Sequence, residues 1–225
     1  MHKMAFGQMQ NILRAAVMGA NDGILSVAGI VIGVAAATTD THKIWLAGFA
    51  GALAGTISMA MGEYVSVHSQ ADAQAKAQAE GAELLVKHPH QALAQVTAGY
   101  EQAGISSGLA QQAAKEVMEK DSLATLVYEQ YGFDIKEKIS ASYAALASML
   151  AFPLGSILPL SMSLGLPGTW RIEGTFLAVV VALALTGYSA ARFSGANPRL
   201  AVLRNLTAGL VTMIGTFGLG WLIGR

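Results

Sequence analysis

The amino-acid sequence predicts an all-α membrane protein with five transmembrane helices and a cytoplasmic three-helix insert between spans two and three. Of the 225 residues, 53% are apolar and only 12% are charged, against roughly 45–50% and about 25% in soluble domains. Five segments are also long and apolar enough to cross a bilayer, which takes roughly 20 residues. These segments lie at 12–37, 44–66, 140–164, 173–193 and 201–223.

The stretch between the second and third segments has a different composition. Residues 67–138 are rich in Ala, Gln, Glu and Lys, which favour helices. Breaks at residues 88–90 and 104–108 divide this stretch into three helices. The chain is therefore expected to divide into 1–66, with the first two spans, 67–138, the insert, and 139–225, with the last three spans.

Small residues in the first two spans have the spacing that lets membrane helices approach closely. Gly29 and Gly33 are four residues apart, as are Gly51 and Gly55. We expect these glycines to serve helix packing.

The basic residues indicate the orientation, because loops rich in Lys and Arg stay in the cytoplasm. The loops on one side hold only Lys43 and Arg171 as basic residues. The N-terminus, the insert and the 192–204 loop should therefore be cytoplasmic, and the lack of a signal or sorting pattern favours a bacterial inner (cytoplasmic) membrane. The insert carries the basic residues Lys76, Lys87, Lys115, Lys120, Lys136 and Lys138, and the 192–204 loop carries Arg192, Arg199 and Arg204.

Several classes of function are disfavoured. The net charge is zero, whereas nucleic-acid binding usually needs a basic patch. The chain has no cysteine, which excludes disulfides, thiolate zinc sites and Fe–S clusters. His-Glu-x-x-His does not occur. The one Gly-x-Ser-x-Gly match, Gly104-Ile-Ser-Ser-Gly108, lies at a helix break in the polar insert and not at the strand-to-helix turn that a nucleophilic serine needs, so we expect no enzyme and no cofactor.

One acid lies deep in the first span. Asp22 is about ten residues into this segment, where a charge costs roughly 3 kcal/mol even on the mildest scales, so that such groups usually serve ions, protons or substrates. The second span adds two thioethers and a second acid in the stretch Ser58-Met59-Ala60-Met61-Gly62-Glu63. Oxygen and sulfur ligands inside a membrane suggest a path for a transition-metal ion.

Three stretches together resemble the vacuolar iron transporter family: Gly19-Ala-Asn-Asp22-Gly-Ile, residues 46–55, and residues 58–70. The resemblance covers nearly the whole chain. It implies a homodimer that moves Fe²⁺, and often Mn²⁺, out of the cytosol in exchange for protons, along a path at the dimer interface. Asp22 matches the family's pathway acid and Met59 its pathway methionine, while Met61 and Glu63 are further candidate metal ligands.

The resemblance also implies that the insert binds metal before transport. The candidate ligands there are Glu80, Glu83, Glu116, Met118, Glu119 and Asp121. Two glutamates of the family's insert are replaced by Gln91 and Gln95, and a glutamate near the cytoplasmic mouth is replaced by Asn11. Amides attract a divalent cation less than carboxylates do, so we expect weaker or fewer sites.

The leading hypothesis is therefore export of Fe²⁺ and/or Mn²⁺ from the cytoplasm by proton antiport. The alternative is a metal-responsive membrane sensor that binds ions without transporting them. The amide substitutions in the insert disfavour a sensor, and Asp22 favours transport. The expected partners are the membrane, metal ions, protons and a second copy of the chain, and no nucleic acid.

Overall fold

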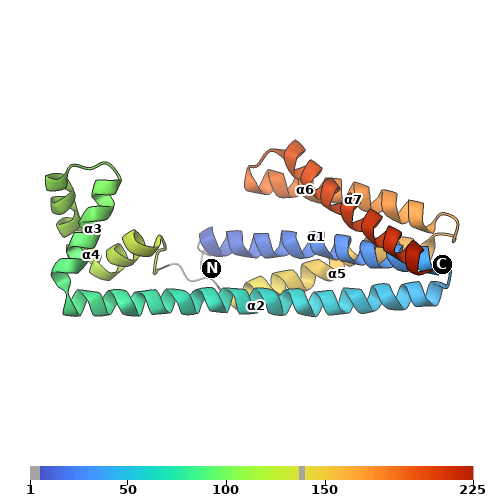
Figure 1. The fold of residues 1–225 in the computed structure, drawn as a ribbon, viewed down its shortest axis with the longest axis horizontal. Helices are drawn as coiled ribbons and strands as arrows, with labels where there is room; N and C mark the ends of the chain where they lie inside the picture. The colour runs from blue at the N-terminus through green and yellow to red at the C-terminus, as the bar shows by residue number, and fades with distance from the viewer. Residues whose placement is uncertain (1–5, 137–139, 225) are drawn as a thin grey trace, which may run out of the picture. The chain divides into compact units, whose positions relative to one another are not determined.

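The structure is a computed structural model that describes residues 6–136 and 140–224, and Lys138 lies outside these residues. Within them all regular structure is helical and no strand occurs, as Figure 1 shows. The helices are α1 (Phe6–Ala37), α2 (Thr41–Lys87), α3 (Pro89–Gln102), α4 (Ser107–Tyr131), α5 (Ala141–Gly165), α6 (Arg171–Ser194) and α7 (Pro198–Ile223). Of these, α1, α2, α5, α6 and α7 are long and apolar enough to cross a membrane. The predicted all-α fold with five spans is confirmed.

The chain forms two compact units. A membrane unit consists of Met9–Val65 with Ala141–Arg225, and an insert unit of Met1–Gln8 with Ser66–Ser140. The first insert helix differs from the sequence prediction, because it is the continuation of α2 and not a separate element. Residues 66–87 contain no proline and consist largely of good helix formers, so nothing ends the helix before Lys87.

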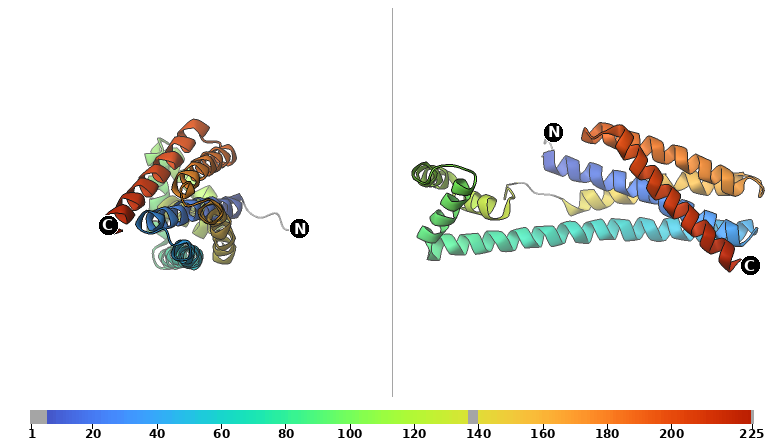
Figure 2. Two further views of the ribbon diagram at one scale, coloured as in Figure 1. Left: turned by 90° about the vertical axis from the view of Figure 1, so that its right-hand side faces the viewer. Right: turned by 45° about the horizontal axis from the view of Figure 1, so that its top comes forward.

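In the membrane unit, glycines bring α1 very close to its neighbours. A Cβ at Gly23 would lie 2.1 Å from the carbonyl oxygen of Phe152, and one at Gly155 would lie 2.1 Å from that of Ala20. The backbones of α1 and α5 therefore touch at this level. Towards the other end of α1, a Cβ at Gly33 would lie 3.0 Å from the carbonyl oxygen of Thr216, where α7 crosses α1 (Figure 2). A Cβ would also lie within 3.0 Å of a neighbouring side chain at Gly29, Gly51 and Gly55, so the packing role expected of these glycines and of Gly33 is confirmed.

Helix α1 is central to this unit because two apolar clusters flank it. One cluster joins α1 to α6 and α7 through the buried residues Ile24, Ala28, Ile32, Val179, Leu183 and Met213. The other joins α1 to α2 and α5 through Val27, Val31, Ile44, Ala52 and Phe152. The position of Asp22 is thus fixed by helices on both sides.

The outer face of α2 carries large apolar side chains that stay exposed. They recur every three or four residues, at Leu46, Phe49, Leu53, Ile57, Met61 and Val65. Such a stripe is too extensive for a water-exposed surface and fits contact with lipid.

The insert unit has a small apolar core of its own. Ala92 and Val96 of α3 pack with Ala114 and Leu126 of α4. Helix α4 is kinked at Asp121, whose backbone is non-helical at φ −159° and ψ 85°.

Candidate functional site

Asp22 lies half-buried on α1 with little to neutralise it. Its Oδ1 accepts a hydrogen bond of 2.8 Å from the hydroxyl of Ser26, one turn further along the same helix. Within residues 6–136 and 140–224, no basic side chain forms an ion pair with it. An ionised carboxylate has about four acceptor positions, so most of the capacity of Asp22 remains available for a cation or a proton.

The residue before Asp22 is tied to two other helices. Oδ1 of Asn21 accepts hydrogen bonds from the amide of Asn205 in α7 at 3.1 Å and from the hydroxyl of Thr186 in α6 at 3.4 Å. Sequence reasoning missed this network. The available signals were Asn21 next to Asp22, and Asn205 and Thr186 as polar residues in otherwise apolar segments.

The two methionines of α2 have different surroundings. Met59 is half-buried and packs against the apolar cluster of Val27, Phe152 and their neighbours, so its thioether lies within the bundle. Met61 is 54% exposed, on the outer face of α2. Of the two, Met59 has the better position to act together with α1.

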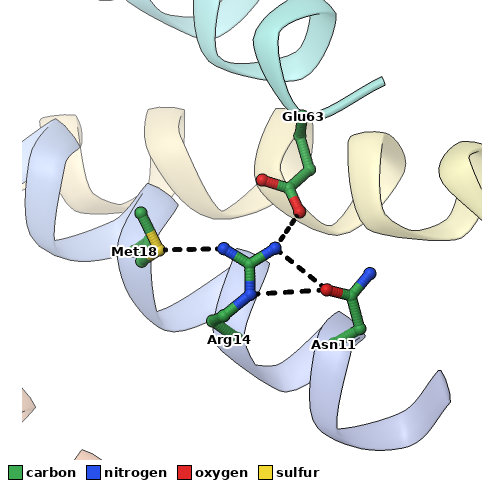
Figure 3. Close-up of polar contacts among 4 residues, drawn as sticks. All are labelled: Asn11, Arg14, Met18 and Glu63. Atoms are coloured by element: carbon green, nitrogen blue, oxygen red, sulfur yellow. Dashed lines mark hydrogen bonds and ion pairs between the residues drawn. The ribbon is translucent and has the colours of Figure 1, made fainter. Parts of the chain in front are cut away.

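Glu63 belongs to a group of four residues, which we call the Arg14 cluster: Asn11, Arg14, Met18 and Glu63 (Figure 3). Arg14 Nη2 lies 2.5 Å from Glu63 Oε1 and donates to Asn11 Oδ1 at 2.9 Å. Its Nη1 donates to the sulfur of Met18 at 3.4 Å. Glu63 was predicted as a candidate metal ligand, and its side chain is only 12% exposed and paired with Arg14.

Arg14 and Met18 were not among the predicted site residues. Arg14 is the one basic residue inside the first apolar segment, and Met18 follows it at a spacing of four. That pattern was visible in the sequence, but the contact with Glu63 depends on the pairing of α1 with α2.

The predicted metal ligands do not converge within one chain. Among the described residues, no group of three or more His, Asp or Glu side chains is close enough to hold an ion. Any complete site around Asp22 therefore needs ligands of other kinds, water or a second copy of the chain.

In the insert unit, the two candidate metal ligands of α2 already have partners. Glu80 accepts a hydrogen bond from the hydroxyl of Tyr131 at 3.1 Å and pairs with Lys76 at 3.7 Å. Glu83 pairs with Lys87 at 2.6 Å. All these pairs are exposed, so they are weak enough for a metal ion to displace them.

The candidate ligands of α4 are also separated by its kink. Asp121 accepts a hydrogen bond from the backbone amide of Ala124 at 3.1 Å and pairs with Lys136 at 2.8 Å. The hydrogen bond from Lys136 is the main cause that lowers the pKa of Asp121. Met118 packs towards the apolar core, Glu116 accepts from Gln112 at 3.0 Å, and Glu119 is exposed. Asp121 thus has a structural role that its spacing from Met118 does not reveal.

These features define the class of protein: a multi-pass helical membrane protein with one unpaired carboxylate inside its bundle. The model of the VIT family matches residues 13–221, and the chain belongs to this family. It is 33% identical to a vacuolar iron transporter of Acanthamoeba castellanii over 223 residues, which cover 98% of this chain and 82% of the relative. It is 36% identical to vacuolar iron transporter homolog 2 of Arabidopsis thaliana, covering 94% of this chain and 84% of the relative.

A third relative, vacuolar iron transporter homolog 1 of Oryza sativa subsp. japonica, is 33% identical over 94% of this chain and 74% of its own length. All three are named as transporters or transporter homologs. The expectation that the chain is not an enzyme is thereby confirmed, and so is the predicted family.

Proposed function

We propose that this protein exports a divalent transition metal, Fe²⁺ and/or Mn²⁺, from the cytoplasm in exchange for protons. The observation that carries the proposal is Asp22, a carboxylate inside a five-span bundle that accepts a hydrogen bond from the hydroxyl of Ser26 and forms no ion pair with any described residue. The names of the relatives, vacuolar iron transporter and its homologs, support iron as the cargo.

Proton exchange follows from the chemistry of the carboxylate. Asp22 can hold either a metal ion or a proton, and a cation nearby favours loss of the proton. Binding of metal from the cytoplasm then releases a proton, and protonation from the other side releases the metal. The thioether of Met59 biases the site towards transition metals over Mg²⁺ and Ca²⁺.

A homodimer would complete the ligand set. One chain supplies a single carboxylate at this depth, and a twofold axis beside α1 would bring the two copies of Asp22 and Met59 to one path. The half-buried position of Asp22 and the exposed side chain of Met18, one turn away, leave this face of α1 open to a partner.

The Lys and Arg distribution favours a cytoplasmic position for the insert and the 192–204 loop, and the inner membrane of a bacterium is the proposed location. The relatives are named vacuolar, and in a vacuolar membrane the same orientation would also remove metal from the cytosol. The direction of transport in the proposal depends on this orientation alone.

Metal uptake into sealed liposomes under an imposed pH gradient tests the proposal, with Fe²⁺, Mn²⁺, Co²⁺, Zn²⁺ and Ca²⁺ compared. Fe²⁺ or Mn²⁺ should enter, and Met59→Leu should reduce their preference over Ca²⁺. Met61→Leu, on the outer face of α2, is the matched control and should not. No uptake of any ion, with metal still bound by the protein, would favour the sensor instead.

A further inference from the structure

The Arg14 cluster brings three kinds of metal ligand to one point. A carboxylate oxygen of Glu63, the amide oxygen of Asn11 and the sulfur of Met18 all contact the guanidinium of Arg14, at 2.5, 2.9 and 3.4 Å (Figure 3). Each of these groups is a ligand that divalent transition metals accept. Here the cation at their centre is a side chain of the protein itself.

The placement of the three groups does not depend on Arg14 alone. Asn11 and Met18 are seven residues apart on α1, which puts them on the same face two turns apart, and Glu63 faces them from α2. The amide nitrogen of Asn11 is buried and has no hydrogen-bond partner among the residues that the structure describes. The Asn11 side chain is therefore oriented by the cation at its oxygen, and a metal ion at the same point would orient it in the same way.

We infer that Arg14 is a tethered cation occupying an access site for divalent metal formed by Asn11, Met18 and Glu63. An arriving ion binds there when the guanidinium swings out. The side chain of Arg14 is 49% exposed and has room to leave, whereas Glu63 is only 12% exposed and stays in place. This inference rests on the proposed function in one respect: the ion that binds at the access site is the ion that the protein transports.

Because Arg14 is tethered, the site prefers divalent over monovalent cations. A guanidinium held in place acts at a high effective concentration, so a free monovalent cation competes with it poorly. A divalent ion gains about twice the Coulomb energy at Glu63 and can displace it. Arg14 and Asp22 are eight residues apart, about 12 Å along the helix, so the access site is distinct from the site at Asp22.

The test is Co²⁺ binding to the purified full-length protein, measured by calorimetry in a background that carries Asp22→Asn. This background removes the deeper acid, and sites in the insert contribute equally to every variant. With Arg14→Gln added, the protein should bind Co²⁺ at least about fivefold more tightly than the Asp22→Asn parent, because one competing ion pair has been removed. Adding Glu63→Gln should abolish the gain, and adding Met18→Leu should reduce it.

Lys43→Gln is the matched control, because it removes a positive charge from a surface pair with Asp40 and should leave Co²⁺ affinity unchanged. Arg14→Lys is a second variant in case Arg14→Gln does not fold, and its single ammonium should hold the three groups less well and bind Co²⁺ more tightly than the parent. No gain in either variant, or a gain that survives Glu63→Gln, would show that Arg14 and Glu63 form a structural ion pair only. Because the readout is binding in Asp22→Asn, it stands whether or not the wild type transports metal.

Discussion

The side-chain amide of Asn205 in α7 donates a hydrogen bond of 3.1 Å to the side chain of Asn21, the residue directly before Asp22 in α1. Thr186 of α6 donates to the same oxygen at 3.4 Å. Successive residues of an α-helix point about 100° apart, so fixing Asn21 also fixes the direction of Asp22. Two helices that supply no predicted metal ligand thereby help to set the rotation of the helix that carries Asp22.

Replacing Asn205 by leucine should remove this constraint. The interhelical hydrogen bond is expected to be worth about 1 kcal/mol in a membrane bundle, so the folded protein should persist with a lower melting temperature. Metal uptake should fall because Asp22 is no longer held in one direction. Thr207→Val is the control on the same helix, since Thr207 bonds only within α7. If Asn205→Leu kept the wild-type uptake and melting temperature, the hydrogen bond between Asn205 and Asn21 would not be needed to orient Asp22.

Alanine at Gly23 should destabilise the membrane unit, because its Cβ would meet the carbonyl oxygen of Phe152 at 2.1 Å and force α1 away from α5. Overpacking of this kind costs about 1–3 kcal/mol. Thermal unfolding of the full-length protein measures the effect. Gly215→Ala provides the comparison, since its Cβ would meet nothing within 4 Å and alanine favours helix, so stability should stay equal or rise. Equal effects of the two substitutions would contradict the packing described.

The fold could be predicted from the sequence because its signals are local. Apolar length defines the spans, and Gly29 and Gly33 indicate a close helix crossing without any knowledge of the partner. The continuity of α2 was not predicted, because the change from apolar to polar composition after residue 66 suggested the end of a helix. No residue at that point breaks a helix, so α2 continues to Lys87.

The candidate site was only partly accessible to sequence reasoning. Asp22 was identified because a lone acid in an apolar segment is conspicuous by itself. The contact of Glu63 with Arg14 was not predicted, because it depends on the packing of α2 against α1. The contact of Asn21 with Asn205 was not predicted either, because it depends on the packing of α7 against α1. The role of Asp121 was hidden for a similar reason, because it depends on a kink and on Lys136 further along the chain.

The pair of Asp121 and Lys136 should make the end of α4 sensitive to pH. The pKa of Asp121 is lowered by the hydrogen bond from Lys136. The pair therefore stabilises the fold fully above the unfolded pKa of about 3.9, and this stabilisation is lost as the pH falls through the lower folded value. The pKa of Lys136 is raised by the hydrogen bond to Asp121, so the stabilisation is complete below the unfolded pKa of about 10.4 and is lost as the pH rises through the higher folded value.

Hydrogen-exchange protection of residues 124–131 measures this effect. Asp121→Ala should lower protection between about pH 5 and 9, and the difference from the wild type should shrink as the pH approaches about 3. Glu119→Gln, a change at an exposed acid two residues away, should have no such effect. If Asp121→Ala lowered the protection by the same amount at acid and at neutral pH, the pair of Asp121 and Lys136 would not act through its charges.

The proposed dimer can be examined by crosslinking, because the chain has no cysteine and any introduced thiol is unique. Met18→Cys lies on the exposed part of α1 near Asp22 and should form a disulfide-linked dimer in the membrane under mild oxidation. Leu177→Cys, an equally apolar and 65% exposed position on α6, should not. Efficient crosslinking at Leu177 with none at Met18 would place the partner elsewhere.

In the proposed mechanism one carboxylate, Asp22, carries both the metal and the proton. The most direct measurement is simultaneous recording of Mn²⁺ uptake and proton release in liposomes, for the wild type and for Asp22→Asn. The wild type should release protons in fixed proportion to the Mn²⁺ taken up, and Asp22→Asn should lose both fluxes while remaining folded. Metal transport by Asp22→Asn with an unchanged ratio of protons to metal would contradict the claim.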